Sequence, residues 1–283
     1  MSKIAIITDS TAYLPQYLVD QYDIKVAASY SIWDGGKEMY RDGLEMLPSE
    51  FYARLKKSTD IPSTSQATVT DFDEIYRPLV AEGKSIVGIH VSPKLSGTMQ
   101  SATLAKENFP DAKIELVNSM STSMELGFHV LAAARAVEAG KSFEEVVEIA
   151  RDAKNQSGIF FVVDTLEYLH RNGRIGGASK LLGTALSLKP LLHVEGGQVE
   201  AFEKVRSKTK AKARLLDVVG EKIEGKQNVR LACLHAATEE EATKLLKEAE
   251  ERFNPIEVIM AEVSPAVGAN VGPGTVGIAY STD

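Results

Sequence analysis

SIVGIHVSPKLSGTMQSA, residues 85–102, contains the pattern that decides the fold. Residues 85–91 form a short run that is apolar on both faces, which is typical of a strand buried inside a parallel sheet. The small residues Ser96, Gly97 and Thr98 follow, and helical periodicity begins at residue 99. A strand, a loop of small polar residues and a helix in this order predict one unit of an α/β domain.

The same alternation extends over the first half of the chain. Further strands are expected at 3–8 and 113–117, and further helices at 70–82 and 122–139. This order predicts an N-terminal α/β domain, residues 1–157, with a parallel sheet covered by helices on both faces. Residues 25–60 interrupt the alternation, and Gly35-Gly36 within them is typical of a hairpin, so we expect a small insertion there.

The second half, residues 158–283, has a different pattern. Two strands joined at Gly196-Gly197 predict an antiparallel hairpin. The other expected elements are a strand at 159–163, a helix at 208–223, a strand at 229–235, a helix at 239–252, and strands at 256–263 and 276–281. The pattern predicts an α+β domain with a mixed or antiparallel sheet. A ligand is expected between the two domains, because clefts between domains are common binding sites.

Composition excludes several classes of protein. The chain has 283 residues, 44% hydrophobic and 25% charged, as in ordinary globular domains. It has no apolar run of about 18 residues and no signal-peptide pattern, so we expect a cytoplasmic protein with no integral membrane segment and at most transient membrane contact. A single cysteine, Cys233, excludes an internal disulfide and any multi-cysteine metal site. We therefore expect no metal and no cofactor.

Charge is distributed unevenly along the chain. The formal net charge of −7 argues against general nucleic-acid binding. Residues 171–214 nevertheless contain ten Lys or Arg and three Glu, so that segment carries +7 and the remainder −14. Two interpretations remain open for the basic residues Lys208, Lys210 and Lys212. They form either a solvated helix face or a docking surface for an acidic or phosphate-bearing partner.

Hydroxyl side chains gather near the ends of the expected strands. Ser10 and Thr11 follow the first strand, Ser96 and Thr98 follow the strand at 85–91, and a run from Ser119 to Ser123 follows the third. A fourth cluster at 63–65 precedes the helix of 70–82. In open α/β sheets these strand ends form the binding edge, where helix N-termini favour anions. Each cluster alone is equally typical of helix N-caps.

Gly97 favours a binding function for its cluster, because a residue without a side chain lets a ligand approach the backbone N–H. The stretch lacks the G-x-S-x-G pattern of a serine nucleophile, and the phosphate-binding glycine motifs are absent from the chain. An esterase or acyltransferase that uses Ser96 as its nucleophile remains an alternative hypothesis. A carrier of another anionic lipid is a second alternative.

Six stretches, taken in order, resemble the DegV family of bacterial fatty-acid-binding proteins. They are IAIITDSTAYLP (4–15), PSTSQ (62–66), LSGTMQSA (95–102), YLHRNGRI (168–175), KPLL (189–192) and VGPGTVGIAY (271–280). The resemblance implies a two-domain α/β fold that holds one long-chain fatty acid between its domains. It further implies a carrier subunit of fatty acid kinase. Such a subunit has no catalytic residue of its own and presents the carboxylate to an ATP-binding partner for phosphorylation to acyl phosphate, which feeds phospholipid synthesis.

The resemblance also assigns roles to individual residues. The carboxylate would be held by Thr64 with Ser65, and by Ser96 with the backbone of Gly97. Asn270 would lie close to it, in a position where the family often has a histidine, and asparagine cannot carry a proton or a charge at neutral pH. Further candidates at the edge of the ligand site are Ser10, Thr98, Ser119 and Met124. Arg171 and Arg174 would bind the kinase.

Overall fold

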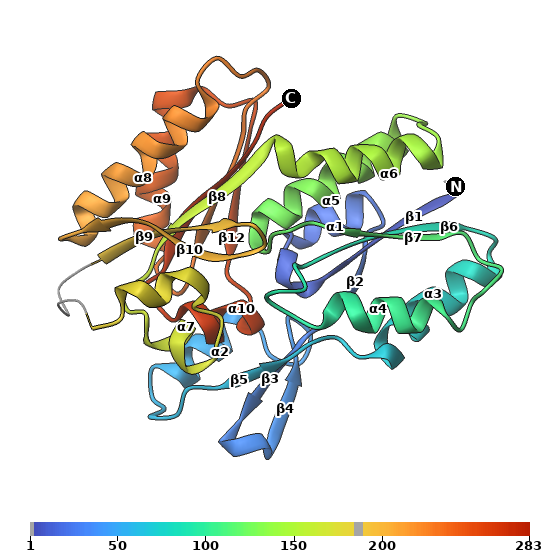
Figure 1. The fold of residues 1–283 in the computed structure, drawn as a ribbon, viewed down its shortest axis with the longest axis horizontal. Coiled ribbons are helices and arrows are strands. Elements are labelled where there is room, and N and C mark those ends of the chain that lie inside the picture. Colours follow the sequence, from blue (N-terminus) through green and yellow to red (C-terminus); the bar gives the residue numbers. More distant parts are fainter. Residues whose placement is uncertain (1–2, 184–188) are drawn as a thin grey trace.

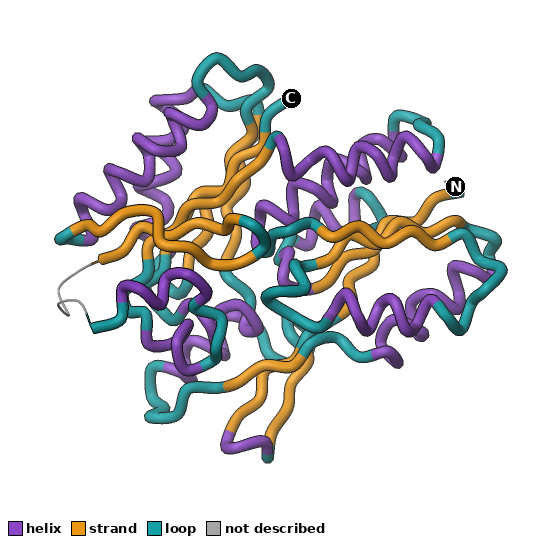
Figure 2. Tube along the Cα trace, viewed as in Figure 1, coloured by secondary structure: helices purple, strands orange, loops and turns teal. Residues whose placement is uncertain are grey.

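The computed structural model describes residues 3–183 and 189–283, and its main features are three β-sheets. Two larger sheets lie side by side and the smallest lies below them in the view of Figure 1. Figure 2 shows that loops and turns occupy much of the region between the two larger sheets. The expected α/β class, with a parallel N-terminal sheet and a mixed C-terminal sheet, is confirmed.

The first sheet has the order β2-β1-β6-β7, and all its neighbours are parallel. Its strands are β1 (Ile4–Asp9), β2 (Lys25–Ala27), β6 (Ser85–His90) and β7 (Ile114–Asn118). The helices are α1 (Gln16–Gln21), α3 (Val69–Ala81), α4 (Thr98–Lys106), α5 (Ser123–Glu138) and α6 (Phe143–Asp152). Helices α3 and α4 cover one face of the sheet, and α5 and α6 cover the other (Figure 1). Because both faces are covered, the strands are apolar on both sides, as β6 is.

The small sheet has the order β4-β3-β5 and is antiparallel. Its strands are β3 (Tyr30–Trp33), β4 (Glu38–Arg41) and β5 (Ser63–Ser65), and α2 (Pro48–Leu55) lies between the second and the third. The predicted hairpin at Gly35-Gly36 is confirmed, and both glycines have positive φ. Two details differ from the expected insertion of 25–60. β2 belongs to the first sheet, and β5 lies beyond residue 60.

The C-terminal sheet has the order β10-β9-β8-β13-β11-β12. Its strands are β8 (Ser157–Val162), β9 (Lys189–Glu195), β10 (Gln198–Val205), β11 (Arg230–His235), β12 (Glu257–Glu262) and β13 (Val276–Ser281). Only β11 and β12 pair in parallel, and the hairpin at Gly196-Gly197 forms as predicted. Helices α8 (Lys208–Ile223) and α9 (Glu239–Phe253) cover its outer face (Figure 1). Two short helices, α7 (Glu167–Arg171) and α10 (Pro265–Val271), were not expected from the sequence.

Buried apolar side chains form one continuous cluster that extends through both halves of the chain. It includes Ile6 and Leu126 from the first half and Phe161 and Leu234 from the second. Separate clusters lie beneath α8 and α9 and beneath α3. The division into domains at residue 157 stays a prediction, because this shared cluster joins the two halves.

The basic residues of α8 are largely paired. Lys208 lies 3.4 Å from Asp164 and 3.3 Å from Glu241, and Lys212 lies 3.0 Å from the same glutamate. Lys210 is exposed. These pairs favour the interpretation of the α8 lysines as a solvated helix face. Among the described residues, no helix has the length and apolar character needed to cross a membrane.

Candidate functional site

A narrow cavity lies where the two larger sheets and the small sheet meet. The empty space between its atoms amounts to about 840 Å³, including its opening to solvent, and the centre of a water molecule fits in only about 90 Å³ of it. Its polar lining consists of Thr11, Tyr13, Ser29, Thr64, Ser65, Gln66, Ser96, Thr122, Ser123, Arg174, Asn270 and Thr275. Its apolar lining consists of Val91, Leu95, Ile159, Phe161, Leu169, Val194, Val199, Leu234, Val263, Ala266, Val267 and Val271.

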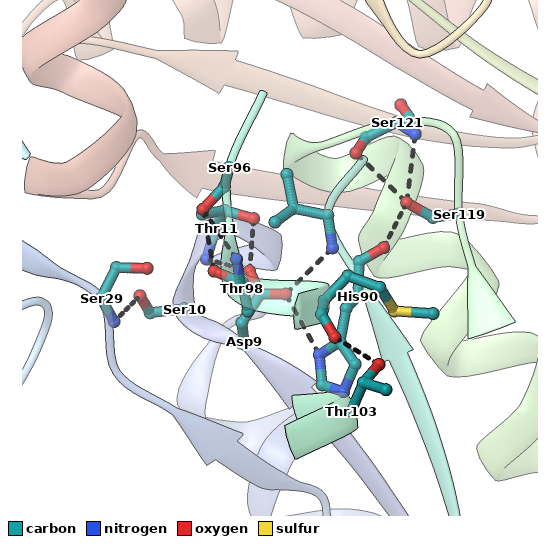
Figure 3. Close-up of polar contacts among 12 residues, drawn as sticks. Asp9, Ser10, Thr11, Ser29, His90, Ser96, Thr98, Thr103, Ser119 and Ser121 are labelled. Atoms are coloured by element: carbon teal, nitrogen blue, oxygen red, sulfur yellow. Dashed lines mark hydrogen bonds and ion pairs between the residues drawn. The ribbon is translucent and has the colours of Figure 1, made fainter. Parts of the chain in front are cut away.

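Ser96 reaches the cavity from the loop that joins β6 to α4. Its backbone N–H donates to the carbonyl of Ser92 at 3.1 Å, and its Oγ lies 2.9 Å from Thr98 Oγ1. The N–H of Thr98 also donates to Ser96 Oγ, at 3.3 Å (Figure 3). Because Ser96 Oγ already accepts this backbone proton, its own hydrogen is left for Thr98 Oγ1 or for a ligand in the cavity.

Gly97 is the residue before the first turn of α4, and Gln66 lies against it. A Cβ atom at Gly97 would be 3.1 Å from the Gln66 side-chain nitrogen, so a larger residue would push Gln66 aside. Thr64 and Ser65 approach from β5, which pairs with β3 at Ser31 and Tyr30. Thr64, Ser65 and Ser96, three of the residues that the resemblance assigned to the carboxylate, all line this cavity.

Thr11 lies in the cavity wall because a buried carboxylate holds it there. Asp9 is fully buried at the end of β1 and accepts hydrogen bonds from both the hydroxyl and the N–H of Thr11. Its other oxygen accepts the N–H of Val91 at 3.0 Å and lies 3.3 Å from His90 Nδ1 (Figure 3). Asp9 thus joins the ends of two neighbouring strands and fixes the hydroxyl of Thr11.

Asn270 lies on α10, and its side chain is oriented by that helix. Its amide nitrogen donates to the carbonyl of Ala266 at 2.8 Å, which places Nδ2 rather than Oδ1 against that carbonyl. The helix begins after Ser264 with proline at its first position and ends at Val271, before Gly272, whose φ is 75°. Asn270 also lines the cavity.

The C-terminal sheet supplies five of the twelve apolar lining residues, and α10 supplies three more. Ile159 and Phe161 reach the cavity from β8, Val194 from β9 and Leu234 from β11. Phe161 and Leu234 lie directly opposite the same residue of β13, Gly277, so all three share one face of the sheet. Met124 and Leu126 of helix α5 lie in the core.

Arg174 lines the cavity at its exposed rim. Its Nε donates to the carbonyl of Leu95 at 3.2 Å, and its Nη1 donates to the carbonyl of Asn172 at 2.6 Å. Leu95 is the residue before Ser96, so this arginine contacts the loop that bears the candidate anchor. Arg171 lies away from the cavity and pairs with Glu167 at 2.6 Å on the exposed side of α7.

Four predicted edge residues do not line the cavity. Ser10 donates to Asp42 at 2.6 Å and accepts the N–H of Ser29 at 3.0 Å. Thr98 is fully buried behind Ser96, and Ser119 donates to the carbonyl of His90 at 2.8 Å (Figure 3). Met124 is a core residue of α5. Ser10 and Ser119 thus join segments that are distant in sequence, and none of the four residues is the N-cap of the helix that follows it, because those caps are Asp9, Gly97 and Thr122.

Tyr13 and Ser123 are cavity residues that the site prediction did not include. Their hydroxyls are hydrogen-bonded to each other although they lie 110 positions apart. Both residues have positive φ, 30° and 62°, and such strain in non-glycine residues gathers at functional sites. Burial raises the pKa of the Tyr13 phenol above its usual range, so this hydroxyl stays neutral. Thr11 and Thr122 also line the cavity; they belong to the hydroxyl clusters noted in the sequence, as Ser123 does, but were not named as site residues, and Gln66 was missed.

No histidine within residues 3–183 and 189–283 is hydrogen-bonded to Ser96. His90 contacts Asp9, and His129 Nε2 lies 2.7 Å from Ser157 Oγ. Burial lowers the pKa of His129 to about 3, so it stays neutral. In the same part of the chain, His, Cys, Asp and Glu side chains form no cluster of three or more that suits a metal ion.

The fold and the cavity define a class of α/β protein that encloses a narrow cavity, lined by both polar and apolar side chains, where its sheets meet. The chain belongs to the DegV family. The family model described as "Uncharacterised protein, DegV family" matches residues 3–283. A DegV domain-containing protein of Clostridium perfringens is 34% identical over 284 residues, which cover 99% of each chain.

Solved structures of the family have the same fold. A structure titled as fatty acid binding of a DegV family protein from Thermus thermophilus matches with a TM-score of 0.93 and 34% identity, over 100% of both chains. The crystal structure of DegV from Bacillus subtilis, described as a fatty acid binding protein, matches with a TM-score of 0.91 and 29% identity, again over 100% of both chains. These matches confirm the fold and the family expected from the sequence.

Proposed function

We propose that this protein binds one long-chain fatty acid in the cavity between its two predicted domains, 1–157 and 158–283. The hydrocarbon chain lies against the apolar wall, and the carboxylate lies at Thr64, Ser65, Ser96, the backbone of Gly97 and Asn270. The observation that carries the proposal is one narrow cavity lined by twelve polar and twelve apolar residues. The fatty-acid binding named for the relatives from Thermus thermophilus and Bacillus subtilis supports it.

In this proposal the apolar lining residues provide the affinity for the fatty acid, and the polar lining residues orient its carboxylate for reaction. Each buried methylene contributes about 0.8 kcal/mol, so a long chain gains on the order of 10 kcal/mol before the cost of leaving a membrane or micelle. The anchor then needs only to orient the carboxylate. Hydroxyl and amide groups do so without a bidentate arginine, which would withdraw charge from the oxygens that must react.

The protein acts as a carrier in this proposal, and a separate ATP-binding kinase supplies the chemistry in the cytoplasm. A carboxylate oxygen attacks the γ-phosphorus of ATP, the bond to the β-phosphate oxygen breaks, and acyl phosphate and ADP are the products. Arg174 supports the presentation, because it lies at the rim of the cavity and contacts the carbonyl next to Ser96. Arg171, exposed on α7, would contact the partner.

The contacts of Ser96 favour a carrier over a serine hydrolase. A nucleophilic serine needs a base within hydrogen-bond reach, and the described partners of Ser96 Oγ are the hydroxyl and the N–H of Thr98. An active-site-directed fluorophosphonate should therefore leave the purified protein unmodified. Stoichiometric labelling of Ser96 would replace the carrier proposal with the esterase alternative.

Competition between head groups on one chain length tests the ligand class. Palmitate, hexadecyl phosphate and methyl palmitate share the length of the tail and differ in the head group. We expect palmitate to bind most tightly, because the anchor has few charged donors for a phosphate dianion and the ester loses the carboxylate charge. Preferential binding of hexadecyl phosphate would favour the carrier of another anionic lipid.

A reconstitution tests the kinase step separately. The protein loaded with palmitate is mixed with the ATP-binding subunit of a bacterial fatty acid kinase, Mg²⁺ and ATP labelled in the γ-phosphate. Label should enter acyl phosphate only when both proteins are present. Tight palmitate binding without any transfer would retain the carrier function and exclude that kinase as the partner.

A further inference from the structure

The two glycines at the tip of the β9–β10 hairpin have different surroundings. Both have positive φ, 58° at Gly196 and 84° at Gly197. A Cβ atom at Gly196 would meet no atom within 4 Å. A Cβ atom at Gly197 would lie 2.5 Å from Ser92 Oγ and 3.3 Å from the methyl group of Met120. The hairpin tip therefore fits directly against the loops that follow β6 and β7, and only a glycine at 197 allows this approach.

Ser92 is the base of the loop that bears Ser96. Its carbonyl accepts the N–H of Leu95 at 2.9 Å and the N–H of Ser96 at 3.1 Å. Its own N–H donates to the carbonyl of Ser121 at 2.9 Å, and the residue is fully buried. A displacement of Ser92 is therefore transmitted through two backbone hydrogen bonds to the candidate anchor.

The same hairpin contributes to the wall for the hydrocarbon chain. Val194 precedes the tip and Val199 follows it, and both line the cavity. A second contact between the halves lies close by, where Arg174 donates to the carbonyl of Leu95. The apolar wall and the anchor loop are thus joined at the hairpin tip.

We propose that Gly197 is a positioning residue for Ser96 and that it acts through Ser92. The hairpin that contributes Val194 and Val199 to the cavity lining thereby also sets the position of the carboxylate anchor. This inference rests on the proposed function. It makes the closeness of the two halves a requirement for holding the carboxylate, and it predicts that a methyl group added at the hairpin tip weakens binding at the head of the ligand.

The test compares Gly197→Ala with Gly196→Ala. Each places an alanine at a positive φ, so both have a similar backbone cost, and only the change at 197 meets Ser92. Relief of that overlap needs a shift of about 0.5 Å or more, because nonbonded carbon and oxygen atoms rarely approach within about 3 Å. We expect palmitate affinity to fall about tenfold or more in Gly197→Ala and less than threefold in Gly196→Ala.

Two second-site variants separate positioning from a structural effect. In a Ser96→Ala background, Gly197→Ala should have little further effect on palmitate affinity, because the group it displaces is gone. Ser92→Ala should restore affinity to Gly197→Ala, since the atom at 2.5 Å is removed and the remaining Ser92 Cβ lies 3.5 Å away.

If Gly197→Ala lowers palmitate affinity as much in the Ser96→Ala background as in the wild type, the inference is wrong, because the hairpin tip would then act on the hydrocarbon chain and not through Ser96. Equal affinities of the two glycine variants would overturn it as well. A wild-type protein that binds no palmitate would instead show that the proposed function is wrong.

Discussion

Removal of the Ser96 hydroxyl is the change with the most definite expected effect on ligand binding. Ser96→Ala deletes one oxygen, which lies 2.9 Å from Thr98 Oγ1 and accepts the Thr98 N–H at 3.3 Å. The backbone of the loop is held separately, through the Ser92 carbonyl. The fold therefore keeps its support, and the free energy of unfolding should fall by about 1 kcal/mol or less.

The effect on binding follows from the charge of the proposed ligand. A hydrogen bond to a charged group contributes about 1.5–3 kcal/mol, which corresponds to a roughly 10- to 150-fold loss of affinity. The same loss would follow from shortening the hydrocarbon tail by about two to four methylenes, at about 0.8 kcal/mol each. Ser96→Ala should therefore bind palmitate about as weakly as the wild type binds a fatty acid of about 12 to 14 carbons, whose tail is shorter than that of palmitate by roughly two to four methylenes.

Equilibrium binding of a chain-length series to both proteins is the assay. Thr103→Val is a matched control, because Thr103 lies on the same helix, α4, with an exposed hydroxyl that donates to the carbonyl of Met99. The control should bind palmitate as the wild type does. Equal palmitate affinity of Ser96→Ala and the wild type would refute the anchor assignment.

Three further predictions concern pH, packing and the partner. Burial raises the pKa of Glu125 to about 7 from 4.5, so the folded protein holds this proton more tightly than the unfolded chain. The free energy of unfolding should therefore fall by about 3 kcal/mol as pH rises from 4.5 to 7. Urea titrations over this pH range should show that fall for the wild type and not for Glu125→Gln. The same dependence of unfolding free energy on pH in both proteins would contradict the prediction. Gly268→Ala should destabilise α10 by about 1–3 kcal/mol, because its Cβ would lie 2.5 Å from the Tyr52 hydroxyl, and Tyr52→Phe should partly rescue it in thermal denaturation. An additive loss in the double variant would argue against this contact. Arg174→Ala should change palmitate affinity less than threefold and reduce acyl phosphate formation at least tenfold, because the guanidinium lies at the rim. If palmitate is lost as well, Arg174 belongs to the anchor.

Local patterns in the sequence were sufficient to predict most of the framework. The strand at 85–91 is apolar on both faces because helices cover both sides of the first sheet, and β6 forms at Ser85–His90. The paired glycines at 35–36 and 196–197 identified both hairpins, since only glycine adopts such turns freely. By contrast, α10 is short and rich in small residues, so it has no apolar periodicity to detect. The sequence feature that indicates this helix is Ser264 followed by Pro265, since proline is favoured at the first position of a helix.

The site was predicted less completely, because its members meet only in three dimensions. Hydroxyl clusters pointed to the edge of the sheet at which the cavity lies, but Ser10 and Ser119 form hydrogen bonds with Asp42 and with the carbonyl of His90 and do not line the cavity. Tyr13 and Ser123 are brought together by backbone conformations that no residue pattern announces. The position of Arg174 beside Leu95 likewise depends on how the two halves of the chain pack.

Native mass spectrometry of the purified protein after incubation with palmitate tests the central claim most directly. The account predicts one added mass per chain, equal to one palmitate, and its loss or marked reduction in Ser96→Ala under the same conditions. A wild-type protein that stays empty at saturating palmitate, or that retains a phosphorylated lipid in preference, would contradict the account.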